Sequence, residues 1–462
     1  QLEFGLVHQV GKERAILYKN ASYLVHPEKL MLPIYKSGSL GFYLTSMALW
    51  VYDLLAGVKK SESRVMLSKA KTIKEEPLLN KEGLLGSGMY YEYRTDDARL
   101  TIEVLKTAVH YGAEAYNYTQ VDDFIIENGQ VVGVHATDLL NNSQFKFNAK
   151  YVVNATGPWV DELRKKNSED LNKHLFLTKG VHLVFSQNKI PLKHSMYFDA
   201  PDGRMVFAVK REGKVYVGTT DTEYHESKET PTCTTEDKVY LLVAVNTMFK
   251  NLNLDELSIE SCWAGLRPLI HEKGKSPSEL SRKDEVFIAK NGLISIAGGK
   301  LTAFRKMAQK IVDRLEFKDK NFGDCRTHNV LLTGSIGVSE KVCEDLRTKL
   351  STYHSKFSDH KNLLRLVHSY GNASFEMMDL AKDDKTLVLT EIDYCIKNES
   401  LEHLVDYYSR RSGKILFATD EVKRDHKDLL AHFVKSKGLS ESQIIKEEML
   451  YEQLKKETLV NP

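Results

Sequence analysis

The sequence predicts a mixed α/β protein followed by a C-terminal all-helical domain, and two features of the chain carry this prediction. Between residues 90 and 316, short apolar runs rich in β-branched residues alternate with segments of helical period. Beyond the polar stretch at 316–327, the apolar residues recur mainly at helical spacing. A chain of 462 residues is long enough for two or three domains of roughly 100–200 residues. We therefore expect one region at 1–320 and a second at 321–462.

Composition excludes several functional classes. The net charge is +2, so the chain lacks the concentrated basic charge typical of nucleic-acid-binding proteins, and we expect no nucleic-acid partner. The five cysteines are scattered and form no C-x-x-C pair. The sixteen histidines form no H-x-x-x-H or H-E-x-x-H pair. These patterns argue against structural zinc and against a catalytic metal.

Individual elements follow from local patterns. Asp96 and Asp97 open a helix whose apolar residues lie on one face. A helix is also expected over 235–249. Strands are expected near 113–118, 121–126, 131–137, 151–154, 181–185, 205–209, 215–218 and 286–289, and C-terminal helices over 342–353 and 440–456.

The segment at 40–58 is the most apolar stretch of the chain. Asp53 and Gly57 interrupt it, so it is too short for a membrane span of roughly 20 residues. Its apolar residues recur at helical spacing: Phe42, Leu44, Met47, Trp50, Val51, Leu54 and Leu55. The pattern favours an amphipathic helix that turns this face toward the core, and a membrane-contacting helix is the alternative.

The stretch at 293–308 is the most informative for function. An apolar run ends in Gly298 and Gly299, and Lys300, Leu301 and Thr302 lead directly into a helical pattern. Glycines allow a flat ligand to approach the backbone, and the N–H groups and positive dipole of the helix N-terminus face that ligand. The turn predicts a site for an anionic or electron-accepting group. An ordinary connection with a surface lysine is the alternative.

A second turn has the same character. A buried strand ends at Asn154 and continues into Ala155, Thr156, Gly157, Pro158 and Trp159. Small residues therefore occupy the carboxyl end of a strand, where open α/β sheets bind their ligands. The alternative is a plain exit from the strand into a turn.

Two arginines and a histidine are candidate substrate ligands. Arg267 is flanked by apolar residues, where an unpaired guanidinium is costly, so it needs either a structural carboxylate or a substrate anion. Arg204 follows a turn and could bind a phosphate or carboxylate, or could be an exposed hairpin arginine. His182 lies on an expected strand and could face a pocket or be a core histidine. The polar strand end at 217–222 could equally be a turn without function.

Taken together, these motifs resemble the FAD-dependent glycerol-3-phosphate dehydrogenases and oxidases, and most closely the bacterial, Bacillus-type dehydrogenases. The family's segments occur in its order and at its spacing: Asn-Ala-Thr-Gly-Pro-Trp, Lys-Gly-Val-His, Gly-Thr-Thr-Asp-Thr, Ala-Gly-Leu-Arg-Pro-Leu and Ala-Gly-Gly-Lys-Leu-Thr. The resemblance runs from residue 1 to about 315 and continues more loosely beyond. Each motif alone is weak, and their common order carries the resemblance.

The resemblance implies a D-amino-acid-oxidase-like fold, in which a flavin-binding domain and a mixed-sheet substrate domain are interleaved before the helical domain. It implies FAD as the cofactor, with Arg204, Arg267 and His182 at the substrate and with Arg267 and Lys300 in catalytic roles. Lys300 would stabilise the negative charge of the reduced flavin. The residues expected at the flavin are Ala155, Thr156, Gly157, Trp159, Gly298, Gly299, Lys300, Leu301 and Thr302.

The implied reaction is oxidation of sn-glycerol 3-phosphate to dihydroxyacetone phosphate, with hydride transfer from C2 to flavin N5, in glycerol catabolism. Electrons would pass to a quinone, which places the enzyme peripherally on the inner face of the cytoplasmic membrane. The alternatives are an oxygen-dependent oxidase and a related flavoenzyme acting on amino or hydroxy acids, because arginine binds carboxylate as readily as phosphate. Self-association as a homodimer stays open.

Part of the family pattern does not occur in the printed sequence. The family begins with a strand, a G-x-G-x-x-G loop and a helix that bind the FAD pyrophosphate. A Ser-Ser-Lys-Leu-Ile-His-Gly-Gly-Leu-Arg-Tyr segment follows and supplies an active-site histidine, which is the expected proton acceptor. Both would precede Gln1, so we expect an N-terminally truncated chain that stays colourless when FAD is added. A flavin-free, non-catalytic domain is the corresponding alternative.

Overall fold

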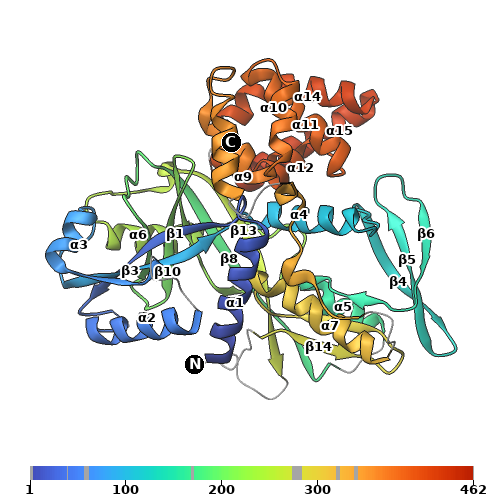
Figure 1. The fold of residues 1–462 in the computed structure, drawn as a ribbon, viewed down its shortest axis with the longest axis horizontal. Helices are drawn as coiled ribbons and strands as arrows, with labels where there is room; N and C mark the ends of the chain where they lie inside the picture. The colour runs from blue at the N-terminus through green and yellow to red at the C-terminus, as the bar shows by residue number, and fades with distance from the viewer. Residues whose placement is uncertain are drawn as a thin grey trace.

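The computed structural model describes residues 4–38, 40–56, 62–167, 171–272, 283–318, 323–337 and 342–460. Its largest element is a nine-stranded mixed sheet with the order β12-β8-β11-β10-β9-β1-β3-β2, in which β13 also pairs with β8 (Figure 1). The strands are β1 (His26–Tyr35), β2 (Val65–Ser68), β3 (Leu84–Arg94), β8 (Lys173–Ser186), β9 (Ser195–Asp199), β10 (Met205–Arg211), β11 (Lys214–Gly218), β12 (Thr222–Glu223) and β13 (Ile259–Glu272).

The two faces of this sheet have different partners. On β8, Val181, Leu183 and Phe185 are fully buried in a cluster that also contains Leu241 and Val245 of α6 (Thr235–Met248). Because side chains alternate along a strand, the residues between them project from the opposite face. His182 and its register partner Trp263 therefore lie on the face away from α6. The expected helix at 235–249 and the expected strand at 181–185 are confirmed.

Helix α2 (Phe42–Ala56) packs differently from the sequence expectation. It buries Thr45 and Leu49, and it exposes Leu44, Met47, Trp50 and Leu54. The buried face of α2 packs directly on the main chain of β3 at two glycines, Gly86 and Gly88. A Cβ at Gly88 would lie 2.6 Å from Leu49, and one at Gly86 would lie 2.7 Å from the Phe42 ring. The prediction of a core-facing apolar face is therefore wrong, and the side chain of Leu55 lies outside the described residues.

A small sheet carries both turns singled out in the sequence. Its order is β14-β15-β7, with β14 (Glu285–Ile288) antiparallel and β7 (Val153–Asn154) parallel to β15 (Ile294–Ala297). Helix α5 (Val160–Lys166) follows β7 after a short 3₁₀ turn, and α7 (Phe304–Lys318) follows β15 after another. The strand–turn–helix arrangement expected at 293–308 is confirmed.

A third sheet forms an antiparallel meander that projects from the body of the molecule beyond α4 (Asp97–His110) (Figure 1). It comprises β4 (Thr119–Glu127), β5 (Gln130–Asp138) and β6 (Gln144–Asn148). The strands expected at 121–126 and 131–137 are confirmed, but the one at 113–118 is wrong. Positive φ angles at Gly112 and Tyr118 turn the chain at both ends of that segment.

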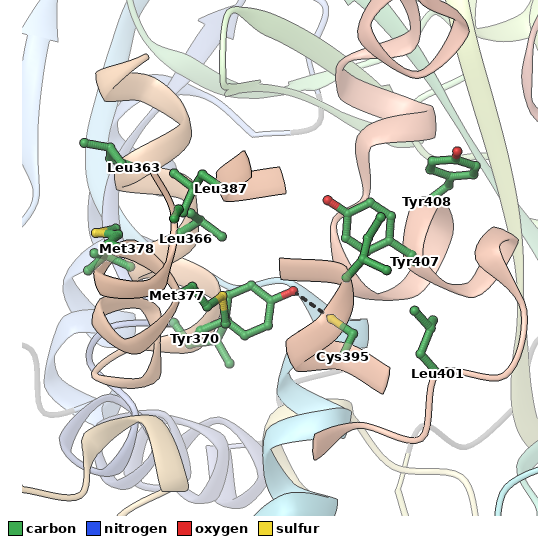
Figure 2. Packing of buried hydrophobic residues seen from close by; sticks show 14 of the residues in the cluster. Leu363, Leu366, Tyr370, Met377, Met378, Leu387, Cys395, Leu401, Tyr407 and Tyr408 are labelled. Atoms are coloured by element: carbon green, nitrogen blue, oxygen red, sulfur yellow. Dashed lines mark hydrogen bonds between the residues drawn. The ribbon is translucent and has the colours of Figure 1, made fainter. Parts of the chain in front are cut away.

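The C-terminal segment is helical, as expected, and forms the upper part of the molecule in Figure 1. Its helices are α8 (Val342–Ser351), α9 (His360–Tyr370), α10 (Ala373–Leu380), α11 (Asp384–Asn398), α12 (Leu404–Asp406), α13 (Lys414–Phe417), α14 (Thr419–Lys437) and α15 (Glu441–Thr458). Figure 2 shows their packing around Tyr370, Met377, Cys395 and Tyr407. The same cluster includes Leu17 of α1 (Phe4–Asn20), so the helical part shares its core with the N-terminal half.

A buried ion-pair network joins α4 to the helical part. Arg99 donates hydrogen bonds to Glu399 at 2.7 Å and to Glu103 at 2.9 Å, and Lys106 bonds both of these carboxylates. Glu103 also accepts a hydrogen bond from Tyr23 at 2.8 Å. Burial opposes ionisation of Glu399, but the cations beside it outweigh that effect and lower its pKa to about 2. Glu399 therefore stays charged across the physiological pH range.

Candidate functional site

The two predicted turns lie side by side at one edge of the small sheet. Ser295 of β15 is the register partner of Asn154 of β7, and the strands are parallel, so both chains leave the sheet at the same edge. Asn154 fixes this arrangement, because its Nδ2 donates to Ser295 Oγ at 3.2 Å and to the Val160 carbonyl at 3.0 Å. The sheet thus brings together two segments that are about 140 residues apart in the sequence.

The turn after β15 requires glycine at two positions. Gly298 and Gly299 have φ angles of +72° and +82°. A Cβ at Gly298 would lie 2.5 Å from the Lys283 carbonyl oxygen, and one at Gly299 would lie 2.7 Å from Met307 Sδ. Lys300 and Leu301 follow and are exposed, and among the described residues the Lys300 ammonium has no partner.

The turn after β7 has an open side. Gly157 has a φ of +58°, and a Cβ there would meet no atom within 4 Å. Ala155 and Thr156 are exposed, while Thr156 Oγ1 donates to Asn154 Oδ1 at 2.7 Å and so stabilises the turn. Trp159 is half-buried and donates from Nε1 to Glu229 at 3.4 Å. The turn therefore presents bare backbone outward at the start of the segment that leads into α5.

The two turns fit a flat, negatively charged group. Both expose main chain at adjacent strand ends, each precedes the N-terminus of a helix, and the free Lys300 ammonium lies next to them. Main-chain N–H groups, a helix dipole and a cation all favour negative charge at this place. The residues present are therefore compatible with the redox-active ring of FAD.

Arg267 of β13 is held over a glycine of the neighbouring strand. Its guanidinium donates to Thr219 Oγ1 at 2.8 Å, to the Thr220 carbonyl at 3.1 Å and to Asp221 at 3.3 Å. A Cβ at Gly180 would lie 2.4 Å from Arg267 Nη2, so only glycine admits this position. The side chain is 36% exposed and can still reach a ligand. The alternative of a structural carboxylate thus applies, with Asp221 as the partner, and binding of a substrate anion stays a prediction.

His182 lies on the same face, between an aromatic ring and a glycine. Its imidazole stacks on Trp263 with 4.5 Å between ring centroids, and a Cβ at Gly218 would lie 2.2 Å from it. Its Nδ1 is buried and has no hydrogen-bond partner in the described part of the chain. Burial and, secondarily, the Arg267 charge lower its pKa to about 4, so His182 is neutral at pH 7. It borders a cavity of about 230 Å³ together with Tyr216.

A small buried cluster connects the turns to Arg267. Val160 after the first turn, Ala297 before the second and Ile270 of β13 pack together. A Cβ at Gly298 would lie 2.9 Å from Ile270, which is three residues along β13 from Arg267. Three residues of a strand span about 10 Å, so the main chain that carries Arg267 passes close to the glycine turn, while Arg267 and Ile270 project from opposite faces of β13.

Arg204 does not join this group. It is exposed, bonds Asp202 at 2.7 Å and lies 4.2 Å over the Tyr240 ring of α6. The sequence assigns no function to the Thr219–Asp221 segment and does not indicate a role for Gly180, although this glycine belongs to the Lys-Gly-Val-His motif. The ring of Phe417 packs edge-on against that of Trp263, with 5.9 Å between the ring centroids. The two residues are about 150 positions apart in the sequence, so no local pattern indicates this contact.

Two kinds of feature were sought in the described residues. Within the ranges that the structure describes, no group of three or more His, Cys, Asp and Glu side chains is placed to hold a metal ion. The described helices include none that combines the length and the hydropathy needed to cross a bilayer.

The chain is similar to known FAD-dependent enzymes over most of its length. The model of the family described as FAD dependent oxidoreductase matches residues 4–305. An aerobic glycerol-3-phosphate dehydrogenase from Bacillus subtilis (strain 168) is 48% identical over 449 residues, which cover 94% of this chain and 81% of the relative. One from Staphylococcus aureus (strain MRSA252) is 46% identical over 93% of this chain and 79% of the relative.

Solved structures agree with this assignment. The glycerol-3-phosphate dehydrogenase from Bacillus halodurans, complexed with FAD, superposes with a TM-score of 0.84 at 38% identity, over 99% of this chain and 86% of that one. An L-α-glycerophosphate oxidase from Mycoplasma pneumoniae has a TM-score of 0.52 at 17% identity, over 67% of this chain and 80% of that one, and therefore shares the fold alone.

Proposed function

The chain belongs to the aerobic glycerol-3-phosphate dehydrogenases, a family of FAD-dependent oxidoreductases, and from this membership we propose that it oxidises sn-glycerol 3-phosphate to dihydroxyacetone phosphate. One observation of the structure supports the proposal most strongly. His182 of β8 and Arg267 of β13 lie on one face of the large sheet, and Ile270 of β13 packs against Val160 and Ala297, which flank the two turns. A cation, a neutral imidazole and bare main chain are what binding of a phosphorylated alcohol beside a flavin requires.

The roles of the residues follow from their partners. FAD, when bound, supplies the acceptor for the hydride that leaves C2 of the substrate. Gly157, Gly298 and Gly299 let that cofactor approach the main chain, and Lys300 and the adjacent helix N-terminus stabilise negative charge there. The remaining cofactor contacts proposed are Ala155, Thr156, Trp159, Leu301 and Thr302.

On the substrate side, Arg267 binds the phosphate or orients the C2 oxygen. Thr219 and Thr220 hold its guanidinium in position, so little ordering is needed when substrate arrives. His182 is neutral at pH 7 and accepts or donates one hydrogen bond at a substrate hydroxyl. Arg204 is the weakest member of the proposed set, because its partners are Asp202 and Tyr240.

The test is anaerobic reduction of the flavin in the FAD-loaded protein by sn-glycerol 3-phosphate. We expect loss of the flavin absorbance in the wild type and at least a tenfold higher substrate requirement for Arg267→Gln, since one charge-assisted contact is lost. Arg424→Gln is the matched control, because Arg424 is 69% exposed and pairs only with its neighbour Asp425. Equal reduction in all three proteins would contradict the role of Arg267.

The electron acceptor is proposed to be a membrane quinone. Support comes from the relatives described above, which are named aerobic glycerol-3-phosphate dehydrogenases and not oxidases. Reduction of a quinone analogue without release of hydrogen peroxide is the expected result. Stoichiometric peroxide would instead favour the oxygen-dependent alternative.

We propose that α2 contacts the inner face of the cytoplasmic membrane. Its outward side carries Leu44, Met47, Trp50 and Leu54, which are 48%, 55%, 53% and 67% exposed. Such a row, on a helix too short to span a bilayer, is typical of interfacial binding. The Trp50→Ser/Leu54→Ser variant should lose co-flotation with anionic vesicles. Leu380→Ser, at a residue 70% exposed on α10, should not.

The division into 1–320 and 321–462 is also a proposal. The large sheet has its own core with α6, and the helical part has another. Limited proteolysis should therefore cut first near residue 320. The chain's self-association as a homodimer is open to measurement by light scattering.

A further inference from the structure

A cavity of about 420 Å³ lies between the strand-rich part and the helical part, and it adjoins the cavity beside His182, because Arg94 lines both. Its walls come from four places. The start of β1 contributes His26, the end of β3 contributes Arg94, the end of β10 contributes Arg211, and α9 with α13 closes the other side. The cavity is strongly polar in composition, so the pairing of its charged groups decides what it can hold.

The carboxylates of this cavity are already committed to partners. Asp96 accepts from Arg211 at 2.8 Å and also caps α4. Glu212 pairs with Arg211 at 3.4 Å, and Glu421 pairs with Lys414 at 2.9 Å. Asp359 accepts from the Asn362 main-chain N–H at 3.0 Å and caps α9. None of these acids is therefore available to a bound cation without breaking an existing contact.

Several donors, in contrast, have no partner. Arg94 uses only Nε, which bonds Glu28 at 3.0 Å, and its two terminal amino groups make no hydrogen bond with any described residue. Lys361 is exposed and likewise lacks an acceptor among them. An arginine with both Nη groups free is suited to bind two oxygens of one anion.

A histidine pair completes the wall. His26 is the register partner of Arg94, and its ring lies 4.1 Å from that of His368 on α9. Its Nε2 is buried and has no hydrogen-bond partner in the described chain. Burial and the charges of Arg94 and Arg347 lower the pKa of His26 to about 3 and that of His368 to about 4, and only Glu212 opposes this for His368. Both rings are therefore neutral, in a positive local potential.

We propose that this cavity is a second anion-binding site, which takes a small phosphate-bearing anion on Arg94, His26, His368 and Lys361. The carboxylates of the cavity are already paired, whereas Arg94 and Lys361 have free donors. An anion can therefore gain hydrogen bonds here without breaking an existing ion pair. A phosphate monoester is small enough for the cavity and has oxygens for both Arg94 amino groups and an imidazole N–H. Bound there, it contacts β1, β3 and α9 together and so ties the strand-rich part to the helical part.

The test is isothermal titration of the full chain with inorganic phosphate as the probe. Arg267→Gln serves as the background in which the proposed catalytic site is weakened. We expect phosphate binding to persist in Arg267→Gln, with a raised thermal midpoint as phosphate is added. Arg94→Gln in that background should weaken the binding at least tenfold, and Lys361→Gln about threefold, while Arg424→Gln should leave it unchanged.

Three results would overturn the proposal. The first is the absence of any phosphate binding up to about 10 mM. The second is loss of all phosphate binding in Arg267→Gln, which would place the only anion site at the catalytic centre. The third is unchanged affinity in both Arg94→Gln and Lys361→Gln; Lys361 is exposed and unpaired, so its substitution keeps the test valid even if Arg94→Gln fails to fold. Failure of glycerol 3-phosphate oxidation would leave these outcomes unaffected.

Discussion

The glycine turn after β15 and the ion-pair network around Arg99 differ in the burial and the pairing of their polar groups. At the turn, main chain is bare, Lys300 has no partner within the described residues, and two glycines are forced into positive φ. In the network, Arg99, Glu103 and Glu399 are completely buried, and every one is bonded to another. The turn leaves its polar groups open to a ligand, whereas the described groups of the network are paired with one another.

This difference in pairing distinguishes polar groups that stabilise the fold from polar groups that can bind a ligand. A buried charge is tolerated only when its partners are in place, so the network contributes to stability and specificity of the fold. An exposed, unpaired group adds nothing to stability and becomes useful only when a ligand supplies the missing contact. The same distinction supports the proposed second anion site, where Arg94 has free donors and Asp96 is already paired with Arg211.

The largest expected effect comes from breaking the network. Glu399→Ala leaves Arg99 buried with only Glu103, and removal of one partner of such a pair costs about 3–5 kcal/mol. Urea unfolding should show this loss. Lys385→Ala is the control, because its pair with Asp428 is 72% and 64% exposed and water screens it, so we expect little change. Equal effects in the two variants would contradict the distinction drawn here.

A smaller effect is expected at the glycine turn. Gly298→Ala adds a Cβ 2.5 Å from the Lys283 carbonyl at a φ of +72°, and we expect about 2–3 kcal/mol of destabilisation together with lower flavin occupancy. Gly129 has nearly the same φ, +74°, but open space around it. Gly129→Ala should therefore cost only about 1 kcal/mol and leave flavin binding intact. An equal loss of flavin occupancy in Gly298→Ala and Gly129→Ala would show that the turn does not contact the cofactor.

The next effect concerns pH. The pKa of His26 is about 3 in the folded protein and close to 6.5 when unfolded, so the unfolded chain binds an extra proton between these values. Stability therefore falls as pH drops from about 6.5 toward 3, by up to about 1.4 kcal/mol per pH unit for this one group. Urea unfolding at pH 7, 6 and 5 should show a shallower decline for His26→Gln than for the wild type. An identical slope would mean that His26 is charged in the folded state.

The smallest effect is expected where the two parts meet. Phe417 of α13 contacts Trp263 at 5.9 Å and lies under the Arg211 guanidinium at 4.2 Å. Phe417→Leu conserves most of the volume and should cost about 1 kcal/mol. It should still raise the accessibility of Trp263 to a fluorescence quencher in a Trp50→Phe/Trp159→Phe background. Unchanged quenching would show that the helical part does not position the Trp263–His182 stack.

Much of the site was predictable because it consists of local patterns. Gly298-Gly299-Lys300 and Ala155-Thr156-Gly157 specify their own turns, and their parallel pairing follows from ordinary α/β topology. The apolar neighbours of Arg267 indicated that it needs an anion, and the family resemblance then predicted a role at the substrate. The residues that hold it were harder to identify, because Gly180 and Thr219 meet it only through strand pairing.

The errors have physical reasons too. The apolar row on α2 was assigned to the core because hydropathy reports which face is apolar and not what covers it. The strand at 113–118 failed because Gly112 and Tyr118 take positive φ angles, a property of the main chain that an alternating side-chain pattern does not indicate. The cavity with its histidine pair could not be predicted, since His26 and His368 are more than 300 residues apart.

The Arg99–Glu399 pair has a consequence for the order in which the protein is made. The two residues are separated by 300 positions in the chain. At about 5–20 residues per second of synthesis, Arg99 and Glu103 leave the ribosome roughly 15–60 s before their partner exists. During that interval α4 carries exposed charges and the α1 residues of the shared core have no cover. The nascent chain thus passes through a long unfinished stage, in which general chaperones have time to bind it.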